Sequence, residues 1–149
     1  MNIPALTAAD IHYLPPAVSW QDAIRLSLLP LLERGAADPE YADAIIQNTL
    51  EFGPYYILLP EIALIHGRPE QGARSEGLAV TGFSAPVEFP ENRPVRLVFA
   101  MTALDSENHL SVMAYLSRLL SDEERVKKLL SAASAEELCA VCLSDLSIP

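Results

Sequence analysis

The stretch from Val95 to Ala103 is almost continuously apolar, and only Arg96 and Thr102 interrupt it. Its length suits one β-strand, and a strand without alternating polar residues is typical of the centre of a sheet that is covered on both faces. This segment therefore predicts a sheet lying between helices, because a buried central strand needs packing partners on each side.

Shorter apolar runs, bounded by glycine or proline, predict the other strands of this sheet. They are Ile11–Leu14, Tyr56–Leu59, Ile62–Ile65, Leu78–Phe83 and Val87–Phe89.

The helices are predicted from polar residues that can cap their first turns. Helices are expected from Trp20 toward Gly35, where Pro30 should kink or shorten the helix, and from Pro39 to about Phe52. A long helix should follow Asp105. Two shorter helices should close the chain, with capping-box spacing at Ser121/Glu124 and Ser134/Glu137.

The order of these elements predicts an α/β fold, a mixed β-sheet flanked by helices. We expect one domain over residues 1–149, because half of the residues are apolar and no repeat, low-complexity stretch or linker is visible.

The formal net charge of −10 argues against nonspecific binding to nucleic acid or to anionic membranes. No run approaches the roughly 18 apolar residues of a membrane helix, and Met1–Asp10 lacks the pattern of a secretory signal. We therefore expect a cytoplasmic protein that is not inserted in the membrane.

His66 follows the apolar run Ile62–Ile65 and opens a loop that contains Gly67 and Gly72. A polar side chain at the end of a strand, followed by glycine, is exposed at the edge of the sheet where ligand sites gather in α/β folds. The alternative interpretation is a histidine that merely ends a strand, and spacing alone does not separate the two.

His109 lies about one turn into the helix that follows Asp105. The N-terminus of a helix offers free N–H groups and partial positive charge to an anion. Taken alone, His109 is better explained as a partly buried helix residue on one face with Met113 and Leu116. The third histidine, His12, is expected to be structural or exposed.

The arginines indicate where an anion could be accommodated. Residues 66–96 hold four of the eight arginines against four glutamates, in a chain that is otherwise strongly acidic. Arg68, two residues after His66, is the candidate for contacting a phosphoryl group. Arg74 and Arg93 are better explained as solvated loop charges.

Other patterns in the sequence give weaker evidence of a functional site. Cys139 and Cys142 have the spacing of half a redox or zinc site, but they fall in an amphipathic helix without a second pair. Asp105 and Glu107 have no neighbours with metal-ligand spacing. No nucleotide-binding motif is present, so no cofactor or metal is expected, and a phosphoryl group would come from another protein.

The segment GPYYILLPEIALIHGRPEQG, from Gly53 to Gly72, resembles the signature of enzyme IIA proteins of bacterial sugar phosphotransferase systems. It is most similar to the mannitol/fructose superfamily and its ascorbate- and galactitol-like branch. The segment DSENH that ends at His109 resembles the second histidine motif of that branch. WQDA, which begins at Trp20, resembles its first helix. The resemblance covers nearly the whole chain.

The resemblance implies that the carrier HPr phosphorylates His66 and that the phosphoryl group passes to a cysteine of an enzyme IIB. An enzyme IIC permease would act further downstream. His109 would be a supporting histidine, and Arg68 could stabilise the phosphoryl group. The apolar helices are also compatible with a homodimer.

The sequence departs from the family pattern at two residues that precede His66 in the chain. Ile65 stands where proline is common, and Glu61 stands where glycine is common. A regulatory enzyme IIA-like protein, whose phosphorylation state controls a partner and not sugar uptake, is therefore the alternative function. A third alternative treats both histidines as structural residues of a binding domain.

Overall fold

Five strands form one sheet in the order β1-β4-β5-β3-β2. The computed structural model describes residues 6–144. The β1–β4 and β3–β5 pairs are parallel, and the β2–β3 and β4–β5 pairs are antiparallel, so the expected mixed sheet is confirmed. The strands are β1 (Ile11–Leu14), β2 (Ile57–Leu59), β3 (Glu61–Ile65), β4 (Gly77–Phe89) and β5 (Arg93–Thr102).

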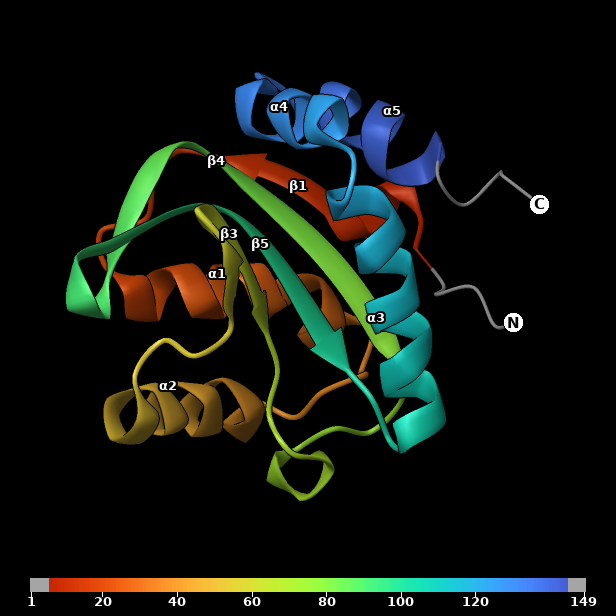
Figure 1. Ribbon diagram of the computed structural model, residues 1–149. Coiled ribbons are helices and arrows are strands. Elements are labelled where there is room, and N and C mark those ends of the chain that lie inside the picture. The colour runs from red at the N-terminus through yellow and green to blue at the C-terminus, as the bar shows by residue number, and fades with distance from the viewer. Residues whose placement is uncertain (1–5, 145–149) are drawn as a thin grey trace.

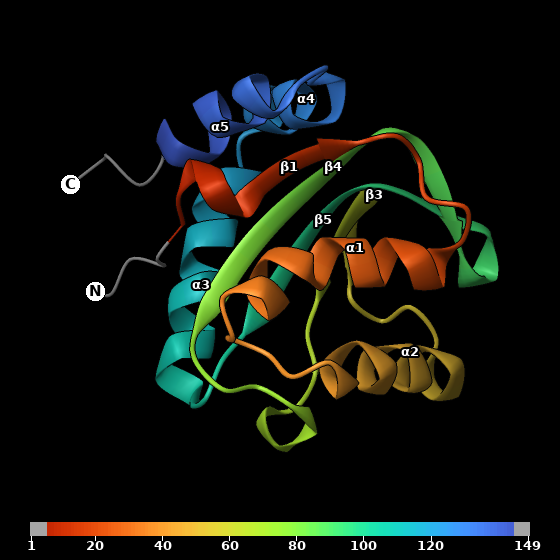
Figure 2. The ribbon, with the colours of Figure 1, turned by 180° about the vertical axis from the view of Figure 1, so that it is seen from behind.

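Helices cover both faces of this sheet (Figures 1 and 2). The first two, α1 and α2, pack on one face, and α3, α4 and α5 pack on the other. Each layer buries its own apolar cluster against the sheet. The helices are α1 (Trp20–Glu33), α2 (Glu40–Phe52), α3 (Ser106–Leu120), α4 (Glu123–Ser131) and α5 (Ala135–Ser144).

Strand β5 is buried on both faces, as its apolar sequence predicts. Val98 and Ala100 belong to the cluster under α1 and α2, whereas Leu97 and Phe99 belong to the cluster under α3, α4 and α5. The neighbours of β5 in the sheet are β4 and β3, so the strand that precedes the His66 loop lies directly beside it.

The two predicted strands Leu78–Phe83 and Val87–Phe89 are one strand, β4. The β4–β5 register shifts between Gly82 and Val87, and Pro86 falls inside that irregular stretch. A proline, which has no N–H to donate, is tolerated in a strand at such a bulge. The strand therefore continues where its sequence indicates a break.

The start of α4 also differs from the prediction. Asp122, not Ser121, caps this helix, because its carboxylate accepts a hydrogen bond from the N–H of Glu124 at 2.9 Å. The prediction at Ser134 is correct, since its hydroxyl accepts from the N–H of Glu137 at 3.2 Å. Pro30 does not end α1, which continues to Glu33.

Across residues 6–144, none of the helices combines the length and the apolar character that crossing a membrane requires.

Candidate functional site

His66 and the start of α3 meet at one edge of the sheet because β3 and β5 are parallel neighbours. His66 directly follows β3, and α3 begins shortly after β5 ends at Thr102. Elements that follow neighbouring parallel strands leave the sheet at the same edge. The rings of His66 and His109 consequently lie edge to face, with centroids 5.7 Å apart and planes inclined by 65°.

A pocket of about 400 Å³ opens at this edge and contains both histidines. Its walls are formed by the end of α2, the loop after β3, the end of β5 and the first turn of α3. Its lining residues are Asn48, Phe52, Tyr55, His66, Gly67, Arg68, Pro69, Met101, Ala103, Asp105, Ser106 and His109.

One ring nitrogen of His66 has a backbone partner. Nδ1 lies 3.3 Å from the carbonyl oxygen of Leu64. A carbonyl oxygen only accepts, so this contact favours the neutral tautomer that carries its hydrogen on Nδ1. The lone pair of the ring then resides on Nε2.

The pKa of His66 lies below its ordinary value. Burial is the main cause because it disfavours the charged ring, and nearby His109 lowers the pKa further. The contact with the Leu64 carbonyl opposes these effects. His66 is therefore predominantly neutral at pH 7, the state in which an imidazole is nucleophilic.

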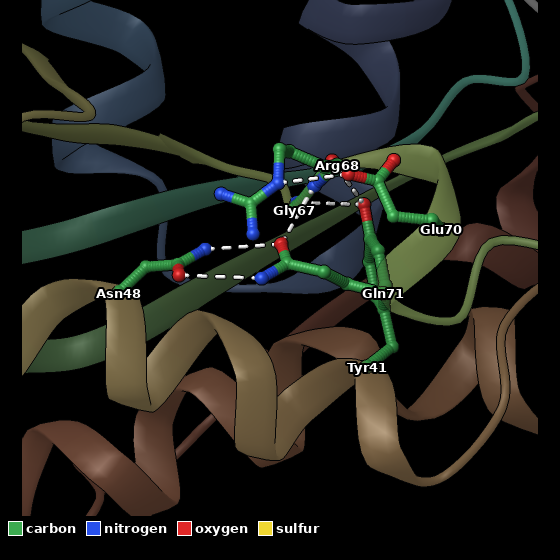
Figure 3. A network of polar contacts seen from close by, with 6 residues as sticks. All are labelled: Tyr41, Asn48, Gly67, Arg68, Glu70 and Gln71. Atoms are coloured by element: carbon green, nitrogen blue, oxygen red, sulfur yellow. Dashed lines mark hydrogen bonds and ion pairs between the residues drawn. The ribbon is translucent and has the colours of Figure 1, made fainter.

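Arg68 borders the pocket on an exposed loop (Figure 3). Its Nε donates to Glu70 at 2.9 Å, and this ion pair is open to solvent. The terminal amino groups of the guanidinium are directed away from Glu70 in Figure 3. They can supply charge-assisted hydrogen bonds to an anion.

The loop after Arg68 is tied to α2 through a pair of side-chain amides (Figure 3). Nδ2 of Asn48 donates to Oε1 of Gln71 at 3.1 Å, and Nε2 of Gln71 donates back to Oδ1 of Asn48 at 3.3 Å. The same Gln71 oxygen accepts from the backbone N–H of Arg68 at 2.8 Å. The amides thus hold the short helix Pro69–Gln71 beside the pocket.

The first turn of α3 supplies the remaining wall. Asp105 caps this helix by accepting from the N–H of Asn108 at 2.9 Å, and Ser106 lines the pocket next to it. The positive end of the helix dipole faces the site from here. Within the described part of the chain, no three His, Cys, Asp or Glu side chains are grouped to hold a metal.

The structure brings three of the candidate residues, His66, His109 and Arg68, into one pocket. The other basic candidates lie elsewhere. His12 is exposed on β1, where Nε2 contacts the carbonyl of Ala9, and Arg74 pairs with Asp38.

Sequence reasoning missed several pocket residues: Asn48, Phe52, Tyr55, Met101 and Ser106. Asn48 offered a signal, because an amide is unusual on the buried face of an amphipathic helix, which here also holds Ala42 and Ile45.

The two departures from the family pattern have different structural settings. Glu61 has φ of 68°, the left-handed region that favours glycine, and the β3–β5 register shifts at this residue. Ile65 is fully buried and pairs with Ala100 in the sheet. Glu61 therefore occupies a strained position, whereas Ile65 fits its strand.

The two cysteines lie on α5, away from the pocket. Burial raises the pKa of Cys142 to about 12, and the pKa of Cys139 is raised as well. Both thiols remain protonated at neutral pH, which does not suit redox or metal chemistry.

A family model described as "Phosphoenolpyruvate-dependent sugar phosphotransferase system, EIIA 2" matches residues 5–144. The chain belongs to this family. The resemblance drawn from the sequence is thereby confirmed. Membership of the EIIA family supports a phosphotransferase role for the chain.

Individual relatives agree with this membership. The mannitol-specific cryptic phosphotransferase enzyme IIA component of Escherichia coli is 37% identical over 89% of this chain and 91% of its own. The E. coli ascorbate-specific EIIA component is 31% identical over 82% of this chain and 81% of its own. A structure of enzyme IIAMTL in complex with phosphorylated enzyme IIBMTL, also from E. coli, has a TM-score of 0.79. It is 25% identical and covers 95% of this chain and 99% of that chain.

Proposed function

We propose that His66 is the phosphoryl acceptor of this EIIA protein, receiving the group from phospho-HPr and passing it to a cysteine of an enzyme IIB. The observation that carries the proposal is the approach of His66 to His109, whose ring centroids lie 5.7 Å apart in one pocket. Two motifs that are distant in the sequence converge there.

Nε2 of His66 is the attacking atom in this proposal. Leu64 occupies the Nδ1 side of the ring, so the lone pair on Nε2 is available. Nε2 attacks the phosphorus of the donor phosphohistidine, and the bond from that phosphorus to the donor nitrogen breaks. In the second step a cysteine thiolate of enzyme IIB attacks the phosphorus, the bond from the phosphorus to Nε2 breaks, and neutral His66 is regenerated.

Phosphoryl transfer needs alignment and charge stabilisation more than covalent help from the protein. Arg68 supplies positive charge at the mouth of the pocket, and a nitrogen of His109 supplies a hydrogen-bond donor. The first turn of α3 adds N–H groups and its dipole. The pocket, at about 400 Å³, has room for a phosphoryl group, and its opening would leave that group accessible to a partner protein.

The partners are proposed from family membership and from the phosphorylated enzyme IIB in the complex of the E. coli relative. HPr and enzyme IIB would use the same pocket in turn, since His66 is the shared acceptor and donor. An enzyme IIC permease would take part only through enzyme IIB.

The test is incubation of the chain with phosphoenolpyruvate, enzyme I and HPr, followed by intact mass measurement in neutral buffer. We expect one added phosphoryl mass that is lost on mild acid treatment and is absent from His66→Ala. The control His12→Ala should be labelled like the wild type. A folded wild-type chain that stays unlabelled beside a labelled reference EIIA would refute the proposal.

A further inference from the structure

The backbone that follows His66 is held by a tyrosine that does not line the pocket. Tyr41, near the start of α2, is fully buried. Its hydroxyl oxygen accepts a hydrogen bond from the N–H of Gly67 at 2.8 Å. The same hydroxyl donates to the carbonyl oxygen of Met101 at 2.8 Å. One side chain from α2 therefore bridges the ends of two neighbouring strands.

The two hydrogen bonds of Tyr41 hold the backbone directly next to His66. Gly67 is the next residue after His66, and Met101 lies in β5 and lines the pocket. The carbonyl of Met101 belongs to β5 and the N–H of Gly67 to the loop directly after β3, so Tyr41 joins the ends of the two parallel strands that create the site. Fixing both fixes the direction in which the His66 side chain leaves the sheet.

The loop that follows His66 also packs closely against the Tyr41 side chain. A Cβ atom added at Gly67 would lie 3.1 Å from Cε1 of Tyr41, and one added at Gly72 would lie 3.1 Å from Cβ of Tyr41. Both approaches are tighter than ordinary van der Waals contact. Both glycines of the loop therefore lie close to this one side chain, which reaches from α2 to Gly67 (Figure 3).

Tyr41 keeps both hydrogen bonds across the physiological pH range. Burial raises the pKa of its hydroxyl to about 12, so the group remains protonated. It can then donate to Met101 and accept from Gly67 at the same time.

We propose that Tyr41 is a positioning residue for His66, which it orients through the backbone of Gly67 and Met101. The inference rests on the proposed function of His66. Transfer between two histidines requires an in-line approach, and a displacement of about 1 Å can cost about a hundredfold in rate. Without the bridge, the Gly67 N–H loses its acceptor, and the contact between Nδ1 of His66 and Leu64 loses its support.

The test compares Tyr41→Phe with Tyr56→Phe. Tyr56 is a matched control because it is also buried, its pKa is also raised to about 12, and its hydroxyl bonds to Thr49 at 2.9 Å, not to the His66 loop. Single-turnover phosphorylation at increasing concentrations of phospho-HPr separates the maximal rate, here called kcat, from the half-saturating concentration, here called KM. NMR titration gives the pKa of His66 in each variant.

For Tyr41→Phe we expect kcat to fall roughly ten- to a hundredfold with KM nearly unchanged. We expect the pKa of His66 to move toward its ordinary value of about 6.5, because a loosened ring is better solvated. Tyr56→Phe should match the wild type in both measurements. Hydrogen exchange of the Gly67 amide should be slow in the wild type and faster in Tyr41→Phe.

Equal kcat values in the two variants, together with an unchanged His66 titration, would overturn the positioning role. An equal loss in both variants would also overturn it, because general loosening of the core would then explain the effect. Fast exchange of Gly67 in the wild-type chain would contradict the bridge itself without any variant. A wild-type chain that HPr does not label would refute the proposed function, whereas the titration and exchange would still test Tyr41.

Discussion

Nδ1 of His66 lies 3.3 Å from the carbonyl oxygen of Leu64, so the strand that presents the histidine also restrains its ring. Leu64 is itself fixed, because it pairs with Phe99 of the neighbouring strand β5. The tautomer of the proposed acceptor is thus determined by the backbone of β3 and its neighbour. This arrangement leaves the lone pair of Nε2 available for attack on phosphorus.

The stability of the chain should depend on the protonation of His66. Its pKa is lower in the folded chain than in the unfolded one, where about 6.5 applies. The unfolded chain therefore binds more protons between these two values, and the free energy of unfolding rises with pH across that window. The contribution is fully present above pH 6.5 and is lost as the pH falls through the folded-state pKa. Denaturant unfolding of wild type and His66→Gln at pH 5.5 and 7.5 measures this difference.

The His66→Gln chain should show a smaller gain in stability between the two pH values than the wild type. NMR titration of the His66 ring supplies the independent check. A pKa of His66 above 6.5 in the folded chain would contradict the assigned effect of burial.

Arg68 should matter for transfer, whereas Arg74 should not. Each is an exposed arginine in one ion pair, with Glu70 and Asp38 respectively, but only Arg68 borders the pocket. Arg68→Gln is expected to slow phosphorylation of His66 about tenfold or more, because a charge-assisted donor is lost. Arg74→Gln is the matched control. Rapid-quench labelling with phospho-HPr compares the two, and equal rates would remove Arg68 from the site.

His109 should affect the rate of transfer but not the ability of His66 to carry the group. His109→Gln keeps a polar side chain and removes the imidazole, so labelling should be slower by roughly ten- to a hundredfold and still reach completion. His12→Gln, at an exposed position of β1, is the control. Incomplete labelling of His109→Gln beside a fully labelled His12→Gln, or a full rate in His109→Gln, would contradict a supporting role.

Glu61 should be a site where glycine stabilises the fold. Its φ of 68° costs a residue with a side chain about 1 kcal/mol relative to glycine. Glu61→Gly is therefore expected to raise the free energy of unfolding by up to about 1 kcal/mol, partly offset by the entropy of the unfolded chain. Urea unfolding measures the change.

Glu88→Gly is the matched control, because Glu88 is exposed in β4 and pairs with Pro94 in the sheet. Glycine in a strand interior should lower the stability by about 0.5–1 kcal/mol. If Glu61→Gly destabilised the chain as Glu88→Gly does, the strain at Glu61 would not be real.

An apolar strand that ends at His66 and a capped helix start before His109 were predictable from local patterns in the sequence. Their meeting was not, because it depends on β3 and β5 being parallel neighbours. Only the resemblance to the enzyme IIA family implied that the two histidines act together. The central position of β5 followed from its continuous apolar character.

The polar support of the pocket could not be predicted in the same way. Tyr41 lies on the buried face of an amphipathic helix, and nothing local distinguishes it from an ordinary core residue. Asn48 and Gln71 find each other only through the fold, because their pairing depends on how α2 packs beside the loop. The cap of α4 was misassigned because Ser121 and Asp122 are adjacent and equally capable caps.

The most direct test of the central claim is to locate the phosphoryl group on the phosphorylated chain. After incubation with phosphoenolpyruvate, enzyme I and HPr, ¹⁵N NMR of histidine-labelled protein in neutral buffer identifies both the residue and the ring nitrogen. We predict a single phosphohistidine at His66, substituted on Nε2, with the hydrogen on Nδ1 still directed at Leu64. A phosphoryl group on His109, on Nδ1 of His66, or on neither histidine of a folded chain would contradict it.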